Sequence, residues 1–305
     1  MAILHEKFID FNSKIELKGD RKDSLLRSRK SIRDKIKKWF SENQPDRLQP
    51  KFRGQGSFEM NTTVKPIVVK GKRKYDLDDG VYFIEKAGEN NREKIDTWHD
   101  WVYNAVNTHT IKETKRKNTC VRVIFSDGHH IDLPIYYKKG TSQKLARRPN
   151  DWINSEPVKF TNWFNGNSNK QTKRLIRYMK AWKDFRQTTN THLKFPSGFA
   201  LTILIVNNYV KKQHDDEAFR ETIRRMYNTL STRNGFKCLR PTTPRGENIF
   251  RDYSKTRKND FLKALKSLLD DCDRAKNDNN FQKASEYLIK NQFGDRFPKG
   301  NNRNT

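Results

Sequence analysis

The chain has little of what exported or membrane-spanning proteins carry. Only three cysteines are spread over its 305 residues: Cys120, Cys238 and Cys272. An odd number of distant cysteines, with no metal-ligand spacing between any two, predicts free thiols in a reducing cytoplasm. The longest apolar run, at 199–206, is too short to span a bilayer, and Glu6 and Asp10 interrupt the apolar start. We therefore expect a cytoplasmic protein.

Apolar residues and acids are also scarce. Apolar residues make up 33% of the chain, which is low for a globular protein, but 19 Phe and 6 Trp along its length can build a packed core. The 64 Lys and Arg outnumber 36 Asp and Glu, and the net charge of +28 attracts polyanions. Nucleotides, nucleic acid and anionic membrane surfaces are all compatible with this charge, because charge alone does not choose among them.

Apolar periodicity predicts a mixed α/β first half and a mainly helical second half. Helices are predicted over 23–41, 95–106, 170–185, 199–210, 260–272 and 280–291. Extended segments are predicted over 65–69, 75–83, 120–125 and 129–136. Asp127-Gly128 is typical of a hairpin turn between the last two, and a basic turn is predicted over 70–74.

This pattern indicates two lobes with a ligand cleft between them. The first, 1–150, includes the N-terminal helix, and the second, 151–293, is helical. The polar segment 294–305 is predicted to be a flexible tail.

The central motif is a pair of acids in a predicted strand. Alternate residues of a strand point to the same side, so Asp76 and Asp78 project together while Leu77 points into a core. Asp132 repeats this pattern on a second strand. If the two strands are neighbours, three carboxylates converge, and a hard divalent cation relieves their repulsion. Such a trio holds two Mg²⁺ ions for phosphoryl transfer.

An isolated Asp-x-Asp pair is more often two solvated acids on a surface strand, so the motif depends on its neighbours. Upstream, Gly56 permits close approach of the backbone to a phosphate. Ser57 is predicted to cap a short helical turn whose free N–H groups favour an anion. A Gly-Ser pair alone usually marks a flexible turn, but its place before Asp76 and Asp78 favours a phosphate site.

Three nearby residues are interpreted as ordinary structural ones. Asp79 has the wrong strand parity to join Asp76 and is predicted to begin a turn. His129 and His130 lie close to Asp132 in the sequence, but Mg²⁺ prefers oxygen ligands, so both are interpreted as strand-end histidines.

These motifs, in this order, resemble the polymerase β-like nucleotidyltransferase superfamily, which includes DNA polymerase β, oligoadenylate synthases and cyclic GMP-AMP synthase. The segments at 55–60, 76–83, 131–134 and 151–157 are similar to those of the bacterial cGAS/DncV-like nucleotidyltransferases of anti-phage CBASS systems. The resemblance covers about residues 5 to 210. It implies an α+β fold with a mixed-sheet nucleotidyltransferase lobe, a mainly helical second lobe and an active site in the cleft between them.

The resemblance also implies an enzyme that makes a cyclic di- or trinucleotide second messenger from nucleoside triphosphates. Asp76, Asp78 and Asp132 match the acids that hold two Mg²⁺ ions, for which Mn²⁺ can substitute. A downstream effector would be reached through the soluble product. Base identity, ring size and linkage do not follow from these residues.

The same resemblance extends to residues that hold the donor triphosphate: Gly56, Ser57, Lys180 and Ser197. From spacing alone, Lys180 would lie on a solvated helix face with Lys173, Arg177 and Asp184. Two departures from the family pattern affect the shape of the donor pocket. Asn61 stands where many relatives carry glycine, and the segment between Ser57 and Asp76 carries the basic insert at 70–74.

The charge of +28 exceeds what a nucleotide cleft requires, and this suggests a second polyanion. RNA or duplex DNA would bind a basic surface and activate the enzyme. The candidate residues are Arg27, Lys30, Lys37, Lys38, Lys70, Lys72, Arg73 and Lys74. Two alternatives stay open: a template-independent linear oligonucleotide synthase, and a catalytically inactive nucleic-acid-binding module. We expect a monomer with no membrane partner.

Overall fold

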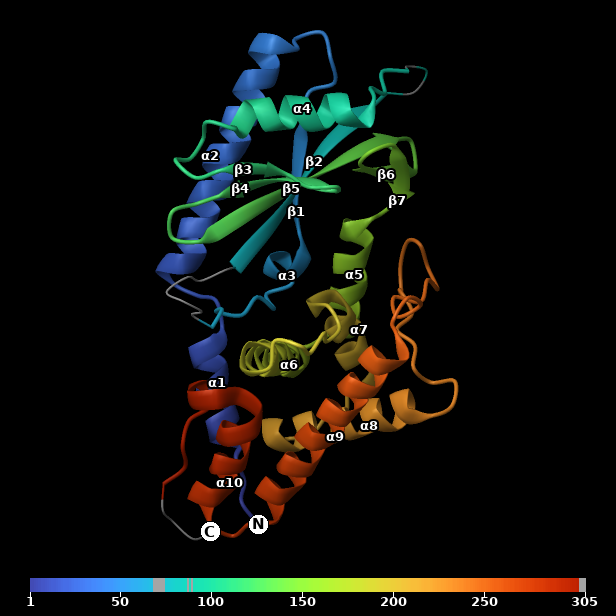
Figure 1. Ribbon diagram of the computed structural model, residues 1–305. Coiled ribbons are helices and arrows are strands. Elements are labelled where there is room, and N and C mark those ends of the chain that lie inside the picture. The colour runs from blue at the N-terminus through green and yellow to red at the C-terminus, as the bar shows by residue number, and fades with distance from the viewer. Residues whose placement is uncertain (68–74, 87, 89, 302–305) are drawn as a thin grey trace.

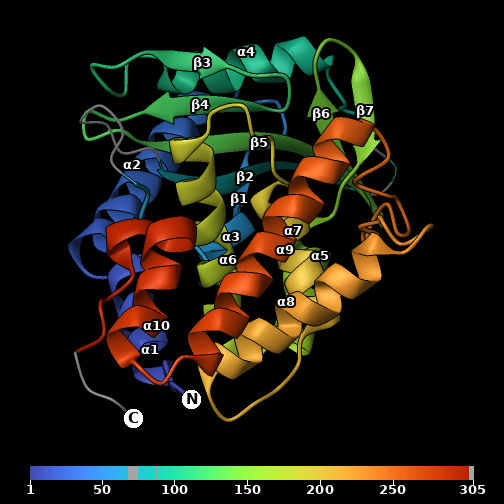
Figure 2. The same ribbon diagram turned by 60° about the horizontal axis from the view of Figure 1, so that its bottom comes forward.

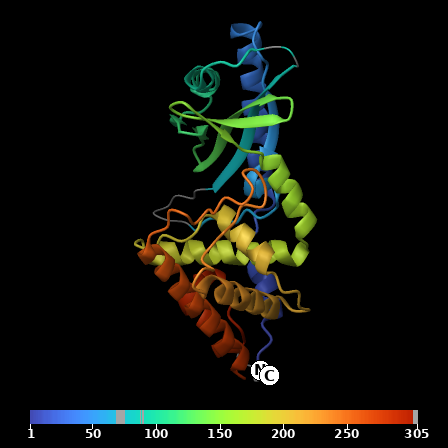
Figure 3. The ribbon, with the colours of Figure 1, turned by 90° about the vertical axis from the view of Figure 1, so that its right-hand side faces the viewer.

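The computed structural model describes residues 1–67, 75–86, 88 and 90–301, and its buried side chains form two separate hydrophobic cores. One core lies within a lobe built on a β-sheet, and the other within a lobe of packed helices, with the sheet lobe above the helical lobe in Figures 1 and 3. The predicted α+β class is therefore confirmed. Within the described residues, no helix combines the length and apolarity needed to cross a bilayer.

A seven-stranded mixed sheet forms the first lobe. Its strands are β1 (Lys51–Gln55), β2 (Tyr75–Glu85), β3 (Thr114–Arg116), β4 (Cys120–Ile124), β5 (His129–Lys139), β6 (Ser142–Arg147) and β7 (Asp151–Asn154). The order is β1-β2-β5-β4-β3, with β6 pairing β5 and β7 pairing β6. Only β2 and β5 run parallel, and the other named pairs are antiparallel. The predicted strands at β2, β4 and β5 are confirmed, as is the hairpin between β4 and β5.

Two amphipathic helices cover one face of this sheet. Helix α2 (Asp20–Asn43) buries Leu25, Ile32 and Ile36 at helical spacing, and α4 (Ile95–Val106) has the predicted bounds. Their side chains share a core with Leu77 of β2 and Ile131 of β5. Because strand side chains alternate, the neighbouring acids on β2 and β5 face the other way, toward the helical lobe.

The helical lobe is assembled around α6. Its elements are α1 (His5–Ile15), α5 (Pro157–Asn167), α6 (Lys170–Thr189), α7 (Gly198–Asn208), α8 (Asp215–Ser231), α9 (Lys255–Asn277), α10 (Phe281–Leu288), a π-helix (Ile289–Phe293) and a 3₁₀ turn (Gly294–Arg296). Helices α8, α9 and α10 cover the side of α6 that is remote from the sheet (Figures 1 and 2). Helix α6 therefore lies between the sheet and the rest of the lobe.

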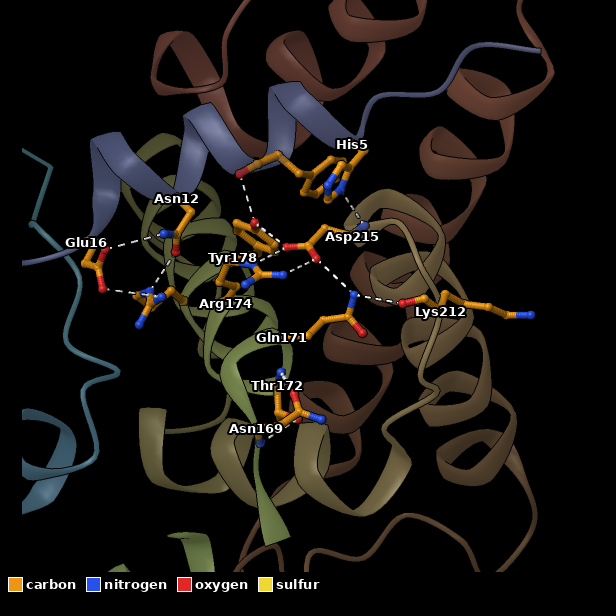
Figure 4. Close-up of polar contacts among 12 residues, drawn as sticks. His5, Asn12, Glu16, Asn169, Gln171, Thr172, Arg174, Tyr178, Lys212 and Asp215 are labelled. Carbon is orange, nitrogen blue, oxygen red and sulfur yellow. Dashed lines mark hydrogen bonds and ion pairs between the residues drawn. The ribbon is translucent and has the colours of Figure 1, made fainter.

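The predicted N-terminal helix at 23–41 is α2 and packs on the sheet. Helix α1 was not predicted, and it belongs to the helical lobe although its residues fall within the span 1–150 that was assigned to the first lobe. Phe8 and Phe11 of α1 pack in the helical core. The Tyr178 hydroxyl lies 2.8 Å from Phe8 O and also 2.8 Å from the buried Asp215 carboxylate. Arg174 donates two hydrogen bonds of 2.6 Å to the same carboxylate, as Figure 4 shows. These contacts join α1, α6 and α8.

The prediction of a flexible tail from Gly294 is wrong for the part of it that the structure describes. Phe297 is 1% exposed and packs with Phe8 and Phe11, because the polar segment carries one large apolar side chain that the core accepts. Arg296 donates to the carbonyls of Lys65 and Ala181 at 3.1 and 2.9 Å. The predicted basic turn at 70–74, with its four candidate cations, lies outside the described residues.

Asp79 does not begin a turn. Strand β2 continues through it, and its fully buried carboxylate accepts hydrogen bonds from Nε and Nη2 of Arg33 on α2 at 2.6 and 2.5 Å. Strand parity predicts the side to which Asp79 points but not its partner, which lies 46 positions away. This ion pair fixes α2 to the sheet.

Replacing Arg33 tests that role. Arg33→Met leaves the Asp79 charge buried without a partner, which should lower the free energy of unfolding by about 3–5 kcal/mol. Urea unfolding measures the change, and Arg27→Met, an exposed position on the same helix, is the control. Equal stability of the two variants would show that the ion pair does not hold α2 in place.

Candidate active site

Four side chains form a square on the face of β2 and β5 that points toward the helical lobe. In the parallel register, Asp76 is opposite His130 and Asp78 is opposite Asp132. Residues two apart on a strand share a face, so all four project together. One donor atom from each of Asp76, His130 and Asp132 lies within 4.8 Å of the other two. The two acid-bearing strands are therefore neighbours, which is the condition that the sequence analysis set.

Asp78 shows the electrostatic consequence of this crowding. Burial and, after it, the charges of Asp76 and Asp132 raise the pKa of Asp78 to about 8, while the charges of Arg122 and Lys180 act to lower it. A cation between the carboxylates relieves this repulsion, and their oxygen atoms suit Mg²⁺. The donor set therefore fits a divalent metal.

Asp132 has a protein cation beside it. Arg122 is opposite Asp132 in the antiparallel pair β4–β5 and donates from Nε and Nη2 to both carboxylate oxygens at 2.7 Å. Each oxygen keeps another lone pair for a metal. Arg122 was not predicted as a site residue. The hairpin turn could have identified it, because residues 122 and 132 are equally far from Asp127 and therefore pair across the hairpin. Burial and Arg122 together lower the pKa of His130, which favours its neutral ring.

The predicted Gly-Ser turn is α3 (Gly56–Glu59), which follows β1. Gly56 has φ +71°, and a Cβ there would collide with the Asp78 carboxylate, so both the backbone and the site require glycine. Ser57 is not the N-cap as predicted. Gln55 holds that position, and the Ser57 hydroxyl lies 2.9 Å from that of Thr63.

A cavity of about 440 Å³ lies between the lobes and joins these elements. From the sheet lobe it is lined by Gly56, Ser57, Asp76 and Asp78, among others. From the helical lobe it is lined by Lys180, Lys183, Asp184, Gly198, Phe199 and Thr202. Of this second set, only Lys180 was predicted as a site residue. Positions three and four residues after Lys180 share its helix face, and that spacing could have identified Lys183 and Asp184.

Lys180 is buried, not solvated. Its side chain is held by hydrogen bonds from Nζ to the carbonyl and the hydroxyl of Thr62, both 3.0 Å. The prediction of a solvated helix face is wrong, since Lys180 is 8% and Arg177 5% exposed. Spacing could not reveal that α6 is covered on both sides. Burial lowers the pKa of Lys180 to about 8, and nearby Asp76 opposes this shift.

Ser197 lies one residue before Gly198 of the cavity lining. It is the N-cap of α7, where its hydroxyl accepts a hydrogen bond from Ala200 N at 3.2 Å. Ser197 is exposed and is not among the cavity-lining residues, whereas the next residue, Gly198, is. The structure thus gathers Gly56, Ser57 and Lys180 around the cavity and leaves Ser197 beside it in the chain.

The backbone conformation of Asn61 explains why asparagine can stand where many relatives carry glycine. Its φ of +53° lies in the left-handed region, where glycine is favoured and asparagine is the next most tolerated residue. Arg177 Nη1 donates to its carbonyl at 2.5 Å. The substitution therefore keeps the turn after α3, and this turn is tied to α6.

Lys180 gives a pH-dependent prediction. With a pKa of about 8, its ammonium is present below pH 8 and is lost as pH rises above it. Affinity for metal-free inorganic tripolyphosphate should therefore fall between pH 7 and 9. Lys180→Arg should reduce this dependence, and the ionisation of Asp78 over the same pH range should leave a remainder. Lys180→Met should weaken binding at pH 7 by about tenfold or more, as expected for hydrogen bonds to a charged group.

Isothermal titration calorimetry measures these affinities, with Lys170→Met, an exposed position on the same helix, as the control. An unchanged pH slope in Lys180→Met would show that another group binds the anion.

Comparisons with known proteins find one nucleotidyltransferase family and several relatives. Residues 50–136 match the family model for the nucleotidyltransferase domain of cyclic GMP-AMP synthase DncV-like proteins. A cyclic GMP-AMP synthase of Escherichia albertii is 32% identical over 175 residues, which is 54% of this chain and 38% of that protein. The Vibrio cholerae cyclic GMP-AMP synthase is 24% identical over 240 residues, covering 58% and 51%. The chain thus matches about half or less of the length of these curated relatives.

Solved structures match over nearly the whole chain. The 3′-deoxy ATP bound form of Vibrio cholerae DncV superposes with a TM-score of 0.82 at 20% identity, covering 97% of this chain and 96% of that chain. DncV in complex with the linear intermediate 5′ pppA(3′,5′)pG gives 0.79, again at 20% identity, with 97% of each chain covered. The shared fold continues past residue 210, where the sequence resemblance ended.

Proposed function

We propose that this chain, which belongs to the bacterial cGAS/DncV-like nucleotidyltransferases, joins nucleoside triphosphates into a cyclic oligonucleotide. The observation that carries the proposal is the acid square of Asp76, Asp78, Asp132 and His130 beside a cavity lined by Gly56 and Lys180. The DncV structures described above hold 3′-deoxy ATP and a linear intermediate, which supports nucleoside triphosphates as substrates and a linear intermediate here.

Asp76, Asp78 and Asp132 are the residues that would hold two Mg²⁺ ions, or Mn²⁺ in their place. When bound, these ions lower the pKa of the acceptor hydroxyl and stabilise the leaving pyrophosphate. The chain's own residues bind and orient the substrate. Gly56 and Ser57 offer donors at the start of α3, and Lys180 offers its ammonium.

Ser197 completes the donor set in this proposal. Its hydroxyl oxygen accepts from Ala200 N, which leaves its proton free to donate to a phosphate oxygen. The acceptor hydroxyl attacks the α-phosphorus of the donor, and the bond to pyrophosphate breaks. The linear product then binds again with its ends exchanged, and the second transfer closes the ring.

Replacing one acid tests the reaction. Asp76→Asn should lower the rate of product formation by more than about 100-fold, because loss of a metal ligand costs more than loss of a residue that only orients one. Labelled triphosphates are incubated with Mg²⁺ or Mn²⁺, and the product is treated with phosphatase. A cyclic product resists phosphatase, whereas a linear synthase would give a sensitive one.

Asp23→Asn, an exposed position on α2, is the matched control and should keep full activity. Undiminished turnover by Asp76→Asn would exclude the metal role of Asp76. No product from the wild-type chain under any condition would favour the inactive nucleic-acid-binding alternative.

A second part of the proposal concerns activation and biological role. Arg27, Lys30, Lys37 and Lys38 are exposed on α2, on a chain whose net charge is +28. We propose that RNA or duplex DNA binds this basic face and activates synthesis, and that the product reaches an effector in anti-phage defence. The other candidate cations lie outside the described residues.

Reversing the charge of this face tests activation. Replacing Arg27, Lys30, Lys37 and Lys38 by Glu should weaken binding of RNA and reduce the salt slope of the affinity by about 3 to 4, because each lost phosphate contact removes about one. Filter binding at several salt concentrations measures the slope. The control replaces exposed cations of the helical lobe with the same charge change: Lys211, Lys212, Arg233 and Lys237. Equal slopes in both variants would remove α2 as the nucleic-acid surface.

A further inference from the structure

His130 is part of the acid square. It stands two residues before Asp132 on β5, so the two side chains share a face, and it is opposite Asp76 in the parallel register. A ring nitrogen of His130 lies within 4.8 Å of a carboxylate oxygen of each acid. The interpretation of His130 as an ordinary strand-end histidine was made without knowing that His130 is opposite Asp76.

The neighbouring histidine shows what a structural role looks like in this strand. His129 is buried, with Nδ1 2.6 Å from Asp127 Oδ1 and Nε2 3.2 Å from Ser28 Oγ. By contrast, the ring of His130 has no hydrogen-bond partner among the residues that the structure describes, although two acids lie close to it. Both ring nitrogens of His129 thus have partners within the fold, whereas His130 has a ring nitrogen close to Asp76 and Asp132.

The distances permit a shared ion. Nitrogen and oxygen ligands lie about 2.0–2.2 Å from a divalent transition metal, so two donors on one ion are at most about 4.4 Å apart. The 4.8 Å cluster reaches this separation with a small movement of its side chains. A neutral imidazole adds a donor without adding charge. The three carboxyl groups have one protein cation in direct contact, Arg122 on Asp132, which leaves room for a divalent cation.

We propose that His130 supplies a nitrogen ligand to the divalent cation held by Asp76 and Asp132, and that this site therefore favours Mn²⁺ over Mg²⁺. Imidazole suits transition metals, whereas Mg²⁺ is held by carboxylates, carbonyls and water. The proposal rests on the proposed function for the presence of a metal. It adds the identity of a ligand and the class of ion.

Pulsed electron paramagnetic resonance tests the nitrogen ligand directly. Mn²⁺ is added to the full chain with inorganic tripolyphosphate, which contains no nitrogen, and the electron spin echo is recorded for protein with natural or ¹⁵N-labelled histidine. Wild type should show modulation from a directly bound nitrogen that changes with the label. His130→Asn should lose it, while His192→Asn, an exposed position, should keep it.

Metal affinity gives a second readout. In His130→Asn the dissociation constant for Mn²⁺ should rise by about tenfold or more, since even residues that only orient a ligand cost about 10–100-fold. The constant for Mg²⁺ should stay within about twofold, because Mg²⁺ uses the oxygen donors. Calorimetry with each ion measures both constants.

Label-independent modulation in the wild type, or equal losses of Mn²⁺ and Mg²⁺ affinity, would overturn the proposal. The labelled wild-type spectrum stands even if His130→Asn does not fold. Failure of the His130 proposal is distinct from failure of the proposed function, because an active enzyme without the nitrogen signal would contradict only the His130 proposal. A nitrogen-bound Mn²⁺ in a protein that makes no nucleotide product would contradict only the proposed synthase activity.

Discussion

Repulsion between carboxylates on one face of two parallel strands is the constraint around which the molecule is arranged. Asp76, Asp78 and Asp132 cannot move apart, because the alternate residues of the same strands, such as Leu77 and Leu133, are almost fully buried under α2 and α4. The core therefore holds the acids in register against their mutual repulsion, which adds to the effect of burial in raising the pKa of Asp78. A fold that concentrates negative charge in this way is prepared for a cation.

The helical lobe supplies the opposite charge. Arg177 and Arg296 donate to carbonyls of Asn61 and Lys65, in the segment between α3 and β2. Lys180 reaches Thr62 in the same segment. Three buried or half-buried cations of one lobe thus bind the backbone that leads to the acids of the other. The cavity wall is consequently built from both lobes, with Gly56, Asp76 and Asp78 on the sheet side and Lys180 on the helical side.

Local patterns predicted what depends on neighbours in the sequence. The period of two placed Asp76, Asp78 and Asp132 on their face, and the Asp-Gly turn placed the hairpin that brings Arg122 to Asp132. What failed depends on distant partners. The role of Asp79 depends on its ion pair with Arg33, and the burial of Lys180 depends on the elements packed around α6. The order of the segment at Phe297 depends on its packing against α1. The interpretation of His130 as an ordinary strand histidine did not use its register with Asp76, which the sequence does not state. Family resemblance supplied Lys180 as a site residue, which spacing had assigned to solvent.

The account's central claim is that the acid square binds a divalent cation, and anomalous diffraction from crystals grown with Mn²⁺ and a non-hydrolysable nucleoside triphosphate tests it most directly. We predict an anomalous peak in contact with Asp76 and Asp132, on the face of β2 and β5 that points toward Lys180. Electron density for the nucleotide in the cavity with no anomalous peak at these acids would contradict the claim.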